Sequence, residues 1–292
     1  MNGGQQQRQK GHNGQDSPGL QGVQGVRRGR EAVSRVLGID VTSVRMPRHV
    51  IFVRHGQTNG NSAGVIQGAT DVPLNDHGRW QAAQTSDALR FLFVGRVSSM
   101  YGGSASAARQ VIIASDLSRA LETAHAFADP LGLKVHGDAR LRERSFGDWE
   151  GRRVEDLLRM YPQAVRGWLD NDGSELQFGV EPKPHVGERG ARAVMEWARR
   201  CLPDTDLYVF SHGAAISQTI NYLLGHRGTD PVDTFQGLLP MDNAFWAVMV
   251  PTPHCSGRMT WSLRVYNQGP TIARKLDWNK DENIKKDSEK EA

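Results

Sequence analysis

The chain has 292 residues, a formal net charge of +4 and a hydrophobic content of 38%, so it is long enough to bury a sizeable core in one large or two small domains. No apolar run is long enough to span a bilayer, and the amino terminus has no signal-peptide core, which leaves membrane attachment and export without support. The two cysteines, Cys201 and Cys255, form no disulfide framework and match no metal spacing. We therefore expect a protein of the reducing cytoplasm.

We expect residues 1–46 to form a disordered, basic amino-terminal tail, because they are rich in Gly, Gln and Arg and lack helical or strand periodicity. A short helix over residues 31–37 is the one element that we expect there. Residues 1–48 carry eight Lys or Arg residues against three acidic ones, a net charge of +5. The basic excess of the chain therefore lies in this tail, and the near-neutral remainder gives nucleic-acid binding no support.

The first predicted strand is the apolar run 50–53, which ends in the octet Arg54-His55-Gly56-Gln57-Thr58-Asn59-Gly60-Asn61. A β-branched and aromatic run followed by charged residues and glycine indicates a buried strand that leads into a loop. In open α/β sheets, ligands bind at the carboxyl ends of the strands. The guanidinium, imidazole and amide groups of the octet could hold and attack a phosphate there, although a polar surface loop would explain the octet alone more simply.

Helices and strands alternate in the next part of the chain. A helix is expected from about Asp76, its predicted cap, to Val94, followed by a loop or insertion over residues 98–108. The buried-strand pattern returns at residues 111–114, and the helix after it carries Arg119 in its first turn. A short strand is expected over residues 131–135.

Arg119 is the second candidate phosphate ligand. Its predicted position near a helix amino terminus favours anions, and a planar fork of donors adds bidentate contacts that one arginine alone cannot supply to a dianion. The alternative is a surface arginine paired with Glu122, one turn further along the helix.

The remaining elements complete an α/β pattern. A strand over residues 206–210 brings Ser211-His212-Gly213 to the same end of the sheet, although a lone histidine at a strand end is more often structural. The other predicted elements are a helix over 153–160, an irregular rim segment over 173–186, a helix over 187–200, a helix ending near Leu224, and closing strands over 244–250 and 261–266. The pattern predicts an α/β fold, a mostly parallel sheet with helices on both faces. We expect one domain over residues 47–268 and a charged tail over 269–292, frayed from Asp277 on.

The octet resembles the signature of the histidine phosphatase superfamily, the phosphoglycerate-mutase-like proteins. That signature reads Arg-His-Gly, then Glu or Gln, Thr or Ser, two variable residues and Asn. Further matches follow in the family's order at residues 67–74, 115–124, 141–151 and 211–213. Such an ordered series is far more specific than any single match. Within the family, residues 147–151 and 241–244 resemble actinobacterial glucosyl-phosphoglycerate phosphatases.

The resemblance implies the phosphoglycerate-mutase-like fold and the phosphatase branch of the family. It makes His55 the nucleophile that becomes a phosphohistidine, and it makes Glu143 the proton donor and acceptor. A carboxyl group that faces a phosphate dianion can hold a proton near neutral pH, whereas the alternative for Glu143 is an ion pair with Arg142 or Arg144. The phosphate ligands implied are Arg54, Asn61, Arg119 and His212. Possible substrate-contacting or auxiliary residues are Gln67, Arg142, Arg144 and Gly213.

The expected activity is metal-independent hydrolysis of a small-molecule phosphomonoester, with no cofactor. Two alternatives stay open: a cofactor-dependent phosphoglycerate mutase and a non-catalytic phosphate-binding module. Family mutases typically have Thr-Gly-Trp soon after the octet, where this chain reads Gln67-Gly68-Ala69-Thr70, and Arg-His-Tyr after the acid residue, where it reads Arg144-Ser145-Phe146. A non-catalytic module would lack His55 or Glu143, and both are present. The physiological substrate and the oligomeric state stay open.

Overall fold

The computed structural model describes residues 45–94, 109–226, 238–253, 259–275 and 277–280. The helix expected at 31–37 and the loop expected at 98–108 lie outside these residues. Among the described residues, no helix is both long and apolar enough to cross a membrane.

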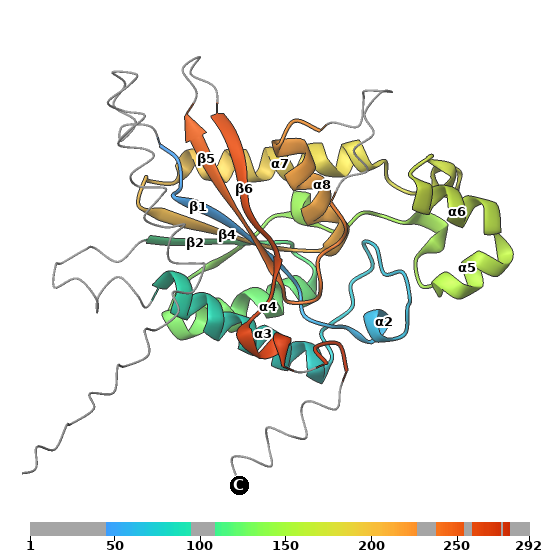
Figure 1. Cartoon of the computed structure of the whole chain (residues 1–292), viewed down its shortest axis with the longest axis horizontal. Helices are drawn as coiled ribbons and strands as arrows, with labels where there is room; N and C mark the ends of the chain where they lie inside the picture. The colour runs from blue at the N-terminus through green and yellow to red at the C-terminus, as the bar shows by residue number, and fades with distance from the viewer. Residues whose placement is uncertain (1–44, 95–108, 227–237, 254–258, 276, 281–292) are drawn as a thin grey trace, which may run out of the picture.

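A six-stranded sheet in the order β3-β2-β4-β1-β5-β6 forms the centre of the fold (Figure 1). The strands are β1 (His49–Arg54), β2 (Arg109–Ala114), β3 (Val135–Gly137), β4 (Thr205–Ser211), β5 (Trp246–Pro253) and β6 (Met259–Gln268). The first four pair in parallel, whereas β5 runs antiparallel to both β1 and β6. The predicted mostly parallel sheet is confirmed.

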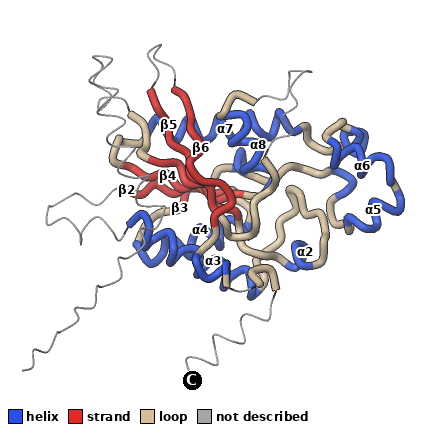
Figure 2. Tube along the Cα trace, viewed as in Figure 1, coloured by secondary structure: helices blue, strands red, loops and turns tan. Residues whose placement is uncertain are grey.

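Helices cover both faces of the sheet, with α3 and α4 on one side and α7 and α8 on the other (Figures 1 and 2). The α-helices are α2 (Asn59–Ser62), α3 (Asp76–Leu89), α4 (Ser118–Ala128), α5 (Val154–Met160), α6 (Pro162–Asp170), α7 (Lys183–Arg200) and α8 (Gly213–Leu223). A π-helical segment, Arg90–Val94, continues α3. The 3₁₀ helices are Asp129–Leu131, Ala139–Leu141, Gly147–Trp149, Ser174–Phe178 and Thr271–Arg274.

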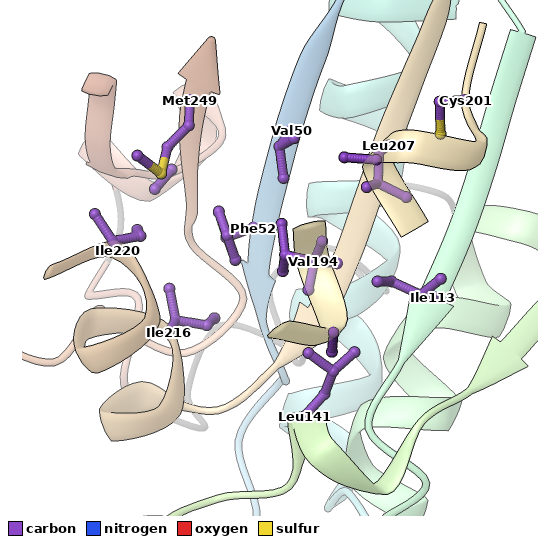
Figure 3. Packing of buried hydrophobic residues seen from close by; sticks show 14 of the residues in the cluster. Val50, Phe52, Ile113, Leu141, Val194, Cys201, Leu207, Ile216, Ile220 and Met249 are labelled. Carbon is purple, nitrogen blue, oxygen red and sulfur yellow. The ribbon is translucent and has the colours of Figure 1, made fainter. Parts of the chain in front are cut away.

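The continuous apolar run of β1 is explained by burial on both of its faces. Val50 and Phe52 pack in one core cluster with residues of α7 and α8, part of which is drawn in Figure 3. Ile51 and Val53 point to the opposite face and pack with α3 and α4. Successive side chains of a strand alternate between faces, so a strand covered on both sides needs apolar residues throughout. This burial fixes the point where β1 ends and the octet begins.

Three local predictions need correction. The cap of α3 is Asn75 rather than Asp76, because Asn75 Oδ1 accepts from Gly78 N at 2.7 Å while Asp76 pairs with Arg79. The strand expected over residues 131–135 begins only at Val135, because a 3₁₀ turn and the left-handed Gly132 precede it. The expected irregular segment 173–186 instead contains a 3₁₀ helix and the first turn of α7.

Buried residues also lie just outside both ends of the predicted domain. Met46, the residue before the predicted start, is only 3% exposed. At the other end Trp278 is only 5% exposed, although residues from Asp277 on were expected to be frayed. A large indole buries enough apolar area to dock a short charged segment.

Candidate active site

Two strands bring the first and last motifs of the chain together. β1 and β4 pair in parallel with Arg54 opposite Ser211, so His55 and His212 follow neighbouring strand ends, and their ring centroids lie 5.1 Å apart. A cavity of about 130 Å³ opens there, lined by Arg54, His55, Asn61, Val65, Ile66, Gln67, Gly68, Arg119, Glu143 and Phe146. The predicted gathering of separate motifs at one edge of the sheet is therefore observed.

His55 is held in one orientation and kept uncharged. Its Nδ1 lies 2.6 Å from the carbonyl oxygen of Gly56, so Nδ1–H donates to that oxygen and the lone pair is left on Nε2. Burial, followed by the nearby Arg54 and Arg119 guanidinium groups, holds the pKa of His55 well below its usual value. A neutral imidazole with a free Nε2 lone pair is a nucleophile at neutral pH.

The loop that carries His55 crosses the start of α3 at very close range. A Cβ atom on Gly56 would lie 2.2 Å from the Gly78 carbonyl oxygen, and one on Gly78 would lie 2.0 Å from the Gln57 carbonyl oxygen. Both residues must therefore be glycine for the two backbones to approach. Gln57 N also donates to Gln81 Oε1 at 2.9 Å, which fixes the loop to the helix.

Arg119 is 1% exposed, and its described hydrogen bonds go to neutral acceptors. It donates to the carbonyl oxygens of Thr70 and Gly68, both at 2.8 Å, and its Nε donates to His212 Nδ1 at 3.2 Å. The alternative pairing with Glu122 is not observed, because the carboxylate of Glu122 lies 3.3 Å from Arg79. Its described hydrogen bonds include none to a carboxylate, so the guanidinium brings a positive charge to the cavity without a directly paired anion.

Arg54 brings the second guanidinium to the cavity. One of its terminal nitrogens donates to the Met241 carbonyl oxygen, whereas its Nε is buried without a hydrogen-bond partner among the described residues. A buried donor that is left unpaired costs roughly 1–3 kcal/mol, so an anion that accepted this hydrogen bond would gain affinity. A Cβ atom on Gly213 would lie 3.4 Å from this Nε, in van der Waals contact with it.

His212 is completely buried, and both of its ring nitrogens contact protein groups. Nδ1 accepts from Arg119, so the proton lies on Nε2, which is 2.8 Å from Ser115 Oγ. Burial and the Arg119 guanidinium hold the pKa of His212 well below its usual value. His212 lies beside His55 as expected, but in this state it orients Arg119 and is not among the residues that line the cavity.

Glu143 lies at the amino terminus of α8. Its carboxylate accepts from the backbone N–H groups of Ala214 at 3.1 Å, Ala215 at 2.9 Å and Arg144 at 2.8 Å. The expected alternative, an ion pair with a neighbouring arginine, is not observed, because Arg142 binds Asp116 through two hydrogen bonds and Arg144 binds Glu175. Glu143 therefore faces the cavity without a cationic side chain bound to it.

Asn61 and Gln67 line the other side of the cavity. Asn61 Oδ1 lies within 3.2 Å of three donors, which are Thr58 N, Thr58 Oγ1 and Asn243 Nδ2. These contacts identify the oxygen end of the amide and leave the Nδ2 end for a ligand. Gln67 Oε1 lies 2.8 Å from Thr58 Oγ1, so Gln67 supports the same turn.

Three of the four suggested substrate-contacting or auxiliary residues, namely Arg142, Arg144 and Gly213, lie outside the cavity lining. Arg142 is exposed and bound to Asp116. Arg144 is 2% exposed, where it pairs with Glu175 at 2.7 Å and donates to the Glu181 carbonyl oxygen at 2.5 Å. A buried arginine with an acidic partner supports the loop and is not accessible to substrate.

Sequence reasoning missed two supporting residues that lie far along the chain from the octet. Asn243 Nδ2 donates to the His55 carbonyl oxygen at 3.1 Å, and Trp278 Nε1 donates in turn to the Asn243 carbonyl oxygen at 2.8 Å. The Trp278 carbonyl oxygen accepts from Gln81 Nε2 and lies 2.8 Å from His77 Nε2. A single tryptophan in an otherwise charged tail was the signal that could have indicated this contact.

The charge at this site comes from side chains. Among the residues that the structure describes, no group of three or more His, Cys, Asp or Glu side chains could hold a metal ion. Arg54 and Arg119 are the cations that line the cavity. The arrangement can bind a dianion, present a nucleophile to it and transfer a proton.

Comparisons with known proteins agree with this geometry. Residues 50–255 match the histidine phosphatase superfamily (branch 1). The chain is 31% identical over 240 residues to the glucosyl-3-phosphoglycerate phosphatase of Mycolicibacterium vanbaalenii, covering 77% of this chain and 97% of that protein. It is 32% identical over 177 residues to a probable phosphoglycerate mutase of Yersinia enterocolitica, covering 60% and 74%.

A solved structure of the mycobacterial glucosyl-3-phosphoglycerate phosphatase with inorganic phosphate superimposes with a TM-score of 0.61 at 26% identity, covering 76% of this chain and 98% of that one. The family and the fold predicted from the motifs are confirmed.

Proposed function

We propose that this chain, which belongs to the histidine phosphatase superfamily, hydrolyses a small phosphomonoester through a covalent phosphohistidine on His55. The observation that carries the proposal is a neutral imidazole, anchored through Nδ1, in a cavity lined by Arg54 and Arg119. The two guanidinium groups attract the phosphate dianion and at the same time keep the nucleophile unprotonated.

In the first step, His55 Nε2 attacks phosphorus in line with the ester oxygen. The P–N bond forms as the P–O bond breaks, and protonated Glu143 gives its proton to the departing alcohol oxygen. Arg54 and Arg119 stabilise the charge on the transferring group. Asn61 contributes its Nδ2 donor, and His212 belongs to the same site through its bond to Arg119.

In the second step, water replaces the alcohol. The Glu143 carboxylate accepts a proton from this water, the water oxygen attacks phosphorus, and the P–N bond breaks. Inorganic phosphate leaves, and both His55 and Glu143 return to their starting protonation states. No metal ion is required in either step.

Glucosyl-3-phosphoglycerate is the first substrate to test, because a relative named glucosyl-3-phosphoglycerate phosphatase matches 77% of the chain. Selectivity among phosphomonoesters would come from residues around the mouth of the cavity, and the exposed Arg142, next in sequence to Glu143, is a candidate. The use of cysteine supports a cytoplasmic location, which stays a prediction.

The experiment that tests the proposal follows free phosphate and 2-phosphoglycerate together. The purified protein is given glucosyl-3-phosphoglycerate, or 3-phosphoglycerate with a catalytic amount of 2,3-bisphosphoglycerate, and His55→Ala is the control. We expect phosphate release that the control lacks. Rapid isomerisation of 3-phosphoglycerate with little phosphate release would instead establish a mutase, the activity named for one relative.

A further inference from the structure

The segment that carries Glu143 is held from behind by one residue of α7. Arg189 Nη1 donates to the carbonyl oxygens of Arg140 at 2.8 Å and Arg142 at 2.7 Å, and Arg189 Nη2 donates to the carbonyl oxygen of Glu143 at 3.0 Å. One planar guanidinium therefore binds three carbonyl groups within four consecutive residues. Three contacts from one rigid group fix the conformation of the backbone at residues 140–143 as well as its distance from α7.

Arg189 is itself fixed by Glu181. Arg189 Nε donates to Glu181 Oε1 at 2.8 Å, and Nη2 donates to Glu181 Oε2 at 2.9 Å, in a pair whose side chains are only 16% and 14% exposed. The backbone N–H of Glu181 also donates to the Ser145 carbonyl oxygen at 2.8 Å. The Arg189–Glu181 pair thus binds the chain on both sides of Glu143.

Other contacts hold the rest of this segment without Arg189. The side chain of Arg140 binds Asp138 and Glu196, and the Leu141 carbonyl oxygen accepts from Ser211 Oγ at 2.7 Å. In contrast, the described hydrogen bonds to the carbonyl oxygens of Arg142 and Glu143 come from Arg189. Arg189 is therefore the described donor to the two backbone carbonyl groups nearest the Glu143 side chain, whose carboxylate is bound separately by three backbone N–H groups.

We propose that Arg189, oriented by Glu181, is a positioning residue that sets the Glu143 carboxyl group at the distance and angle needed for proton transfer to the leaving oxygen. This inference rests on the proposed function. A displacement of about 1 Å in a reacting group can cost about 10²-fold in rate, and general acid catalysis contributes about 10²–10⁴-fold. Loss of Arg189 should therefore impair acid catalysis selectively.

The test compares phenyl phosphate with p-nitrophenyl phosphate, two aryl esters of similar shape. The phenolate of the first is a poor leaving group that needs a proton from Glu143, whereas p-nitrophenolate leaves without one. The value of kcat/KM reports the steps up to departure of the alcohol, so it isolates the acid role of Glu143 from its later role as a base. In Arg189→Met we expect kcat/KM for phenyl phosphate to fall about 10²-fold and kcat/KM for p-nitrophenyl phosphate to fall far less.

Three further variants make the test decisive. Arg192→Met removes an exposed arginine from the same helix and should leave kcat/KM unchanged for both substrates. Arg189→Lys keeps the charge without the planar fork and should show the same selective loss, which covers the case in which Arg189→Met does not fold. Adding Arg189→Met to Glu143→Gln should cause no further loss with phenyl phosphate, because the positioned group is already absent.

Equal losses with both esters, or an additive loss in the double variant, would overturn the positioning role and leave Arg189 a purely structural residue. The failure of the proposed function would look different. In that case Glu143→Gln itself would show no preference for the better leaving group, or His55→Ala would remain active.

Discussion

The buried Trp278 connects the carboxyl-terminal segment to the catalytic loop, although the composition of this segment alone suggests that it is dispensable. Its indole Nε1–H donates to Asn243, and the Asn243 side chain donates to the backbone of His55. We therefore expect Trp278→Ala to weaken both the fold and the catalytic loop. Truncation of a buried Trp or Phe to Ala costs about 3–5 kcal/mol, and Trp278 at 5% exposure falls in this class.

Trp278→Phe separates packing from hydrogen bonding. Phenylalanine keeps most of the apolar contact but leaves the Asn243 carbonyl oxygen without this donor, which costs about 1–3 kcal/mol if the oxygen stays buried. We expect a smaller loss of unfolding free energy than in Trp278→Ala, measured by urea denaturation followed by tryptophan fluorescence and circular dichroism. The value of kcat should fall in the same order, because His55 loses support.

The matched control is Trp261→Phe, the same substitution on the edge strand β6. It should alter the fluorescence and leave kcat unchanged. If Trp278→Ala unfolds at the same urea concentration as the wild type and turns over at the same rate, Trp278 supports neither the fold nor the loop that carries His55.

Five further predictions concern the active site and the amino-terminal tail. Label trapped from substrate should lie on His55, be lost in acid, survive alkali and be absent from His55→Ala; acid-stable label would contradict this. Burial and nearby cations hold the pKa of His55 well below its usual value. Once the ionisation of the substrate phosphate, with a second pKa of about 6, is allowed for, the enzyme's acid limb of kcat/KM should lie well below pH 6.5, and an enzyme limb at about 6.5 would refute the assignment. Because their pKa values are lowered in the folded protein, His55 and His212 bind fewer protons in the folded state than in the unfolded state. The stability that they contribute should therefore be complete above about pH 6.5 and be lost as the pH falls below it. Urea unfolding at two pH values measures this change. Exhaustive chelation should leave kcat unchanged, and restoration of lost activity by Mg²⁺ or Zn²⁺ would refute charge stabilisation by arginine. Deletion of residues 1–44, which stops short of the buried Met46, should change neither turnover nor unfolding.

The sheet and the motif-bearing loops could be predicted because their signals are local. β1 is apolar along its whole length since both of its faces are buried, and this pattern marks the strand and its end without knowledge of its neighbours. Parallel strands then bring their carboxyl ends to one edge. Residues that follow β1 and β4, such as His55 and His212, had to meet there.

The partners of individual charged side chains could not be predicted, because they depend on contacts distant in sequence. Arg142 and Arg144 are two positions apart, yet one is exposed and pairs with Asp116 while the other is buried with Glu175. The sequence contains no signal that distinguishes them. The same holds for Asn243, which reaches the octet across 188 positions.

The different partners of the buried arginines explain why phosphate should bind where it is proposed to bind. Arg119 and Arg144 are both among the largest fully buried side chains. Arg144 pairs with the carboxylate of Glu175, so its charge is neutralised within the fold. Arg119 donates only to the two carbonyl oxygens of the 68–70 turn and to a neutral His212, which position the guanidinium without cancelling its charge. A fixed cation without a directly bonded carboxylate, in a partly desolvated cavity, is the preorganised electrostatic environment that lowers the energy of a transferring phosphoryl group.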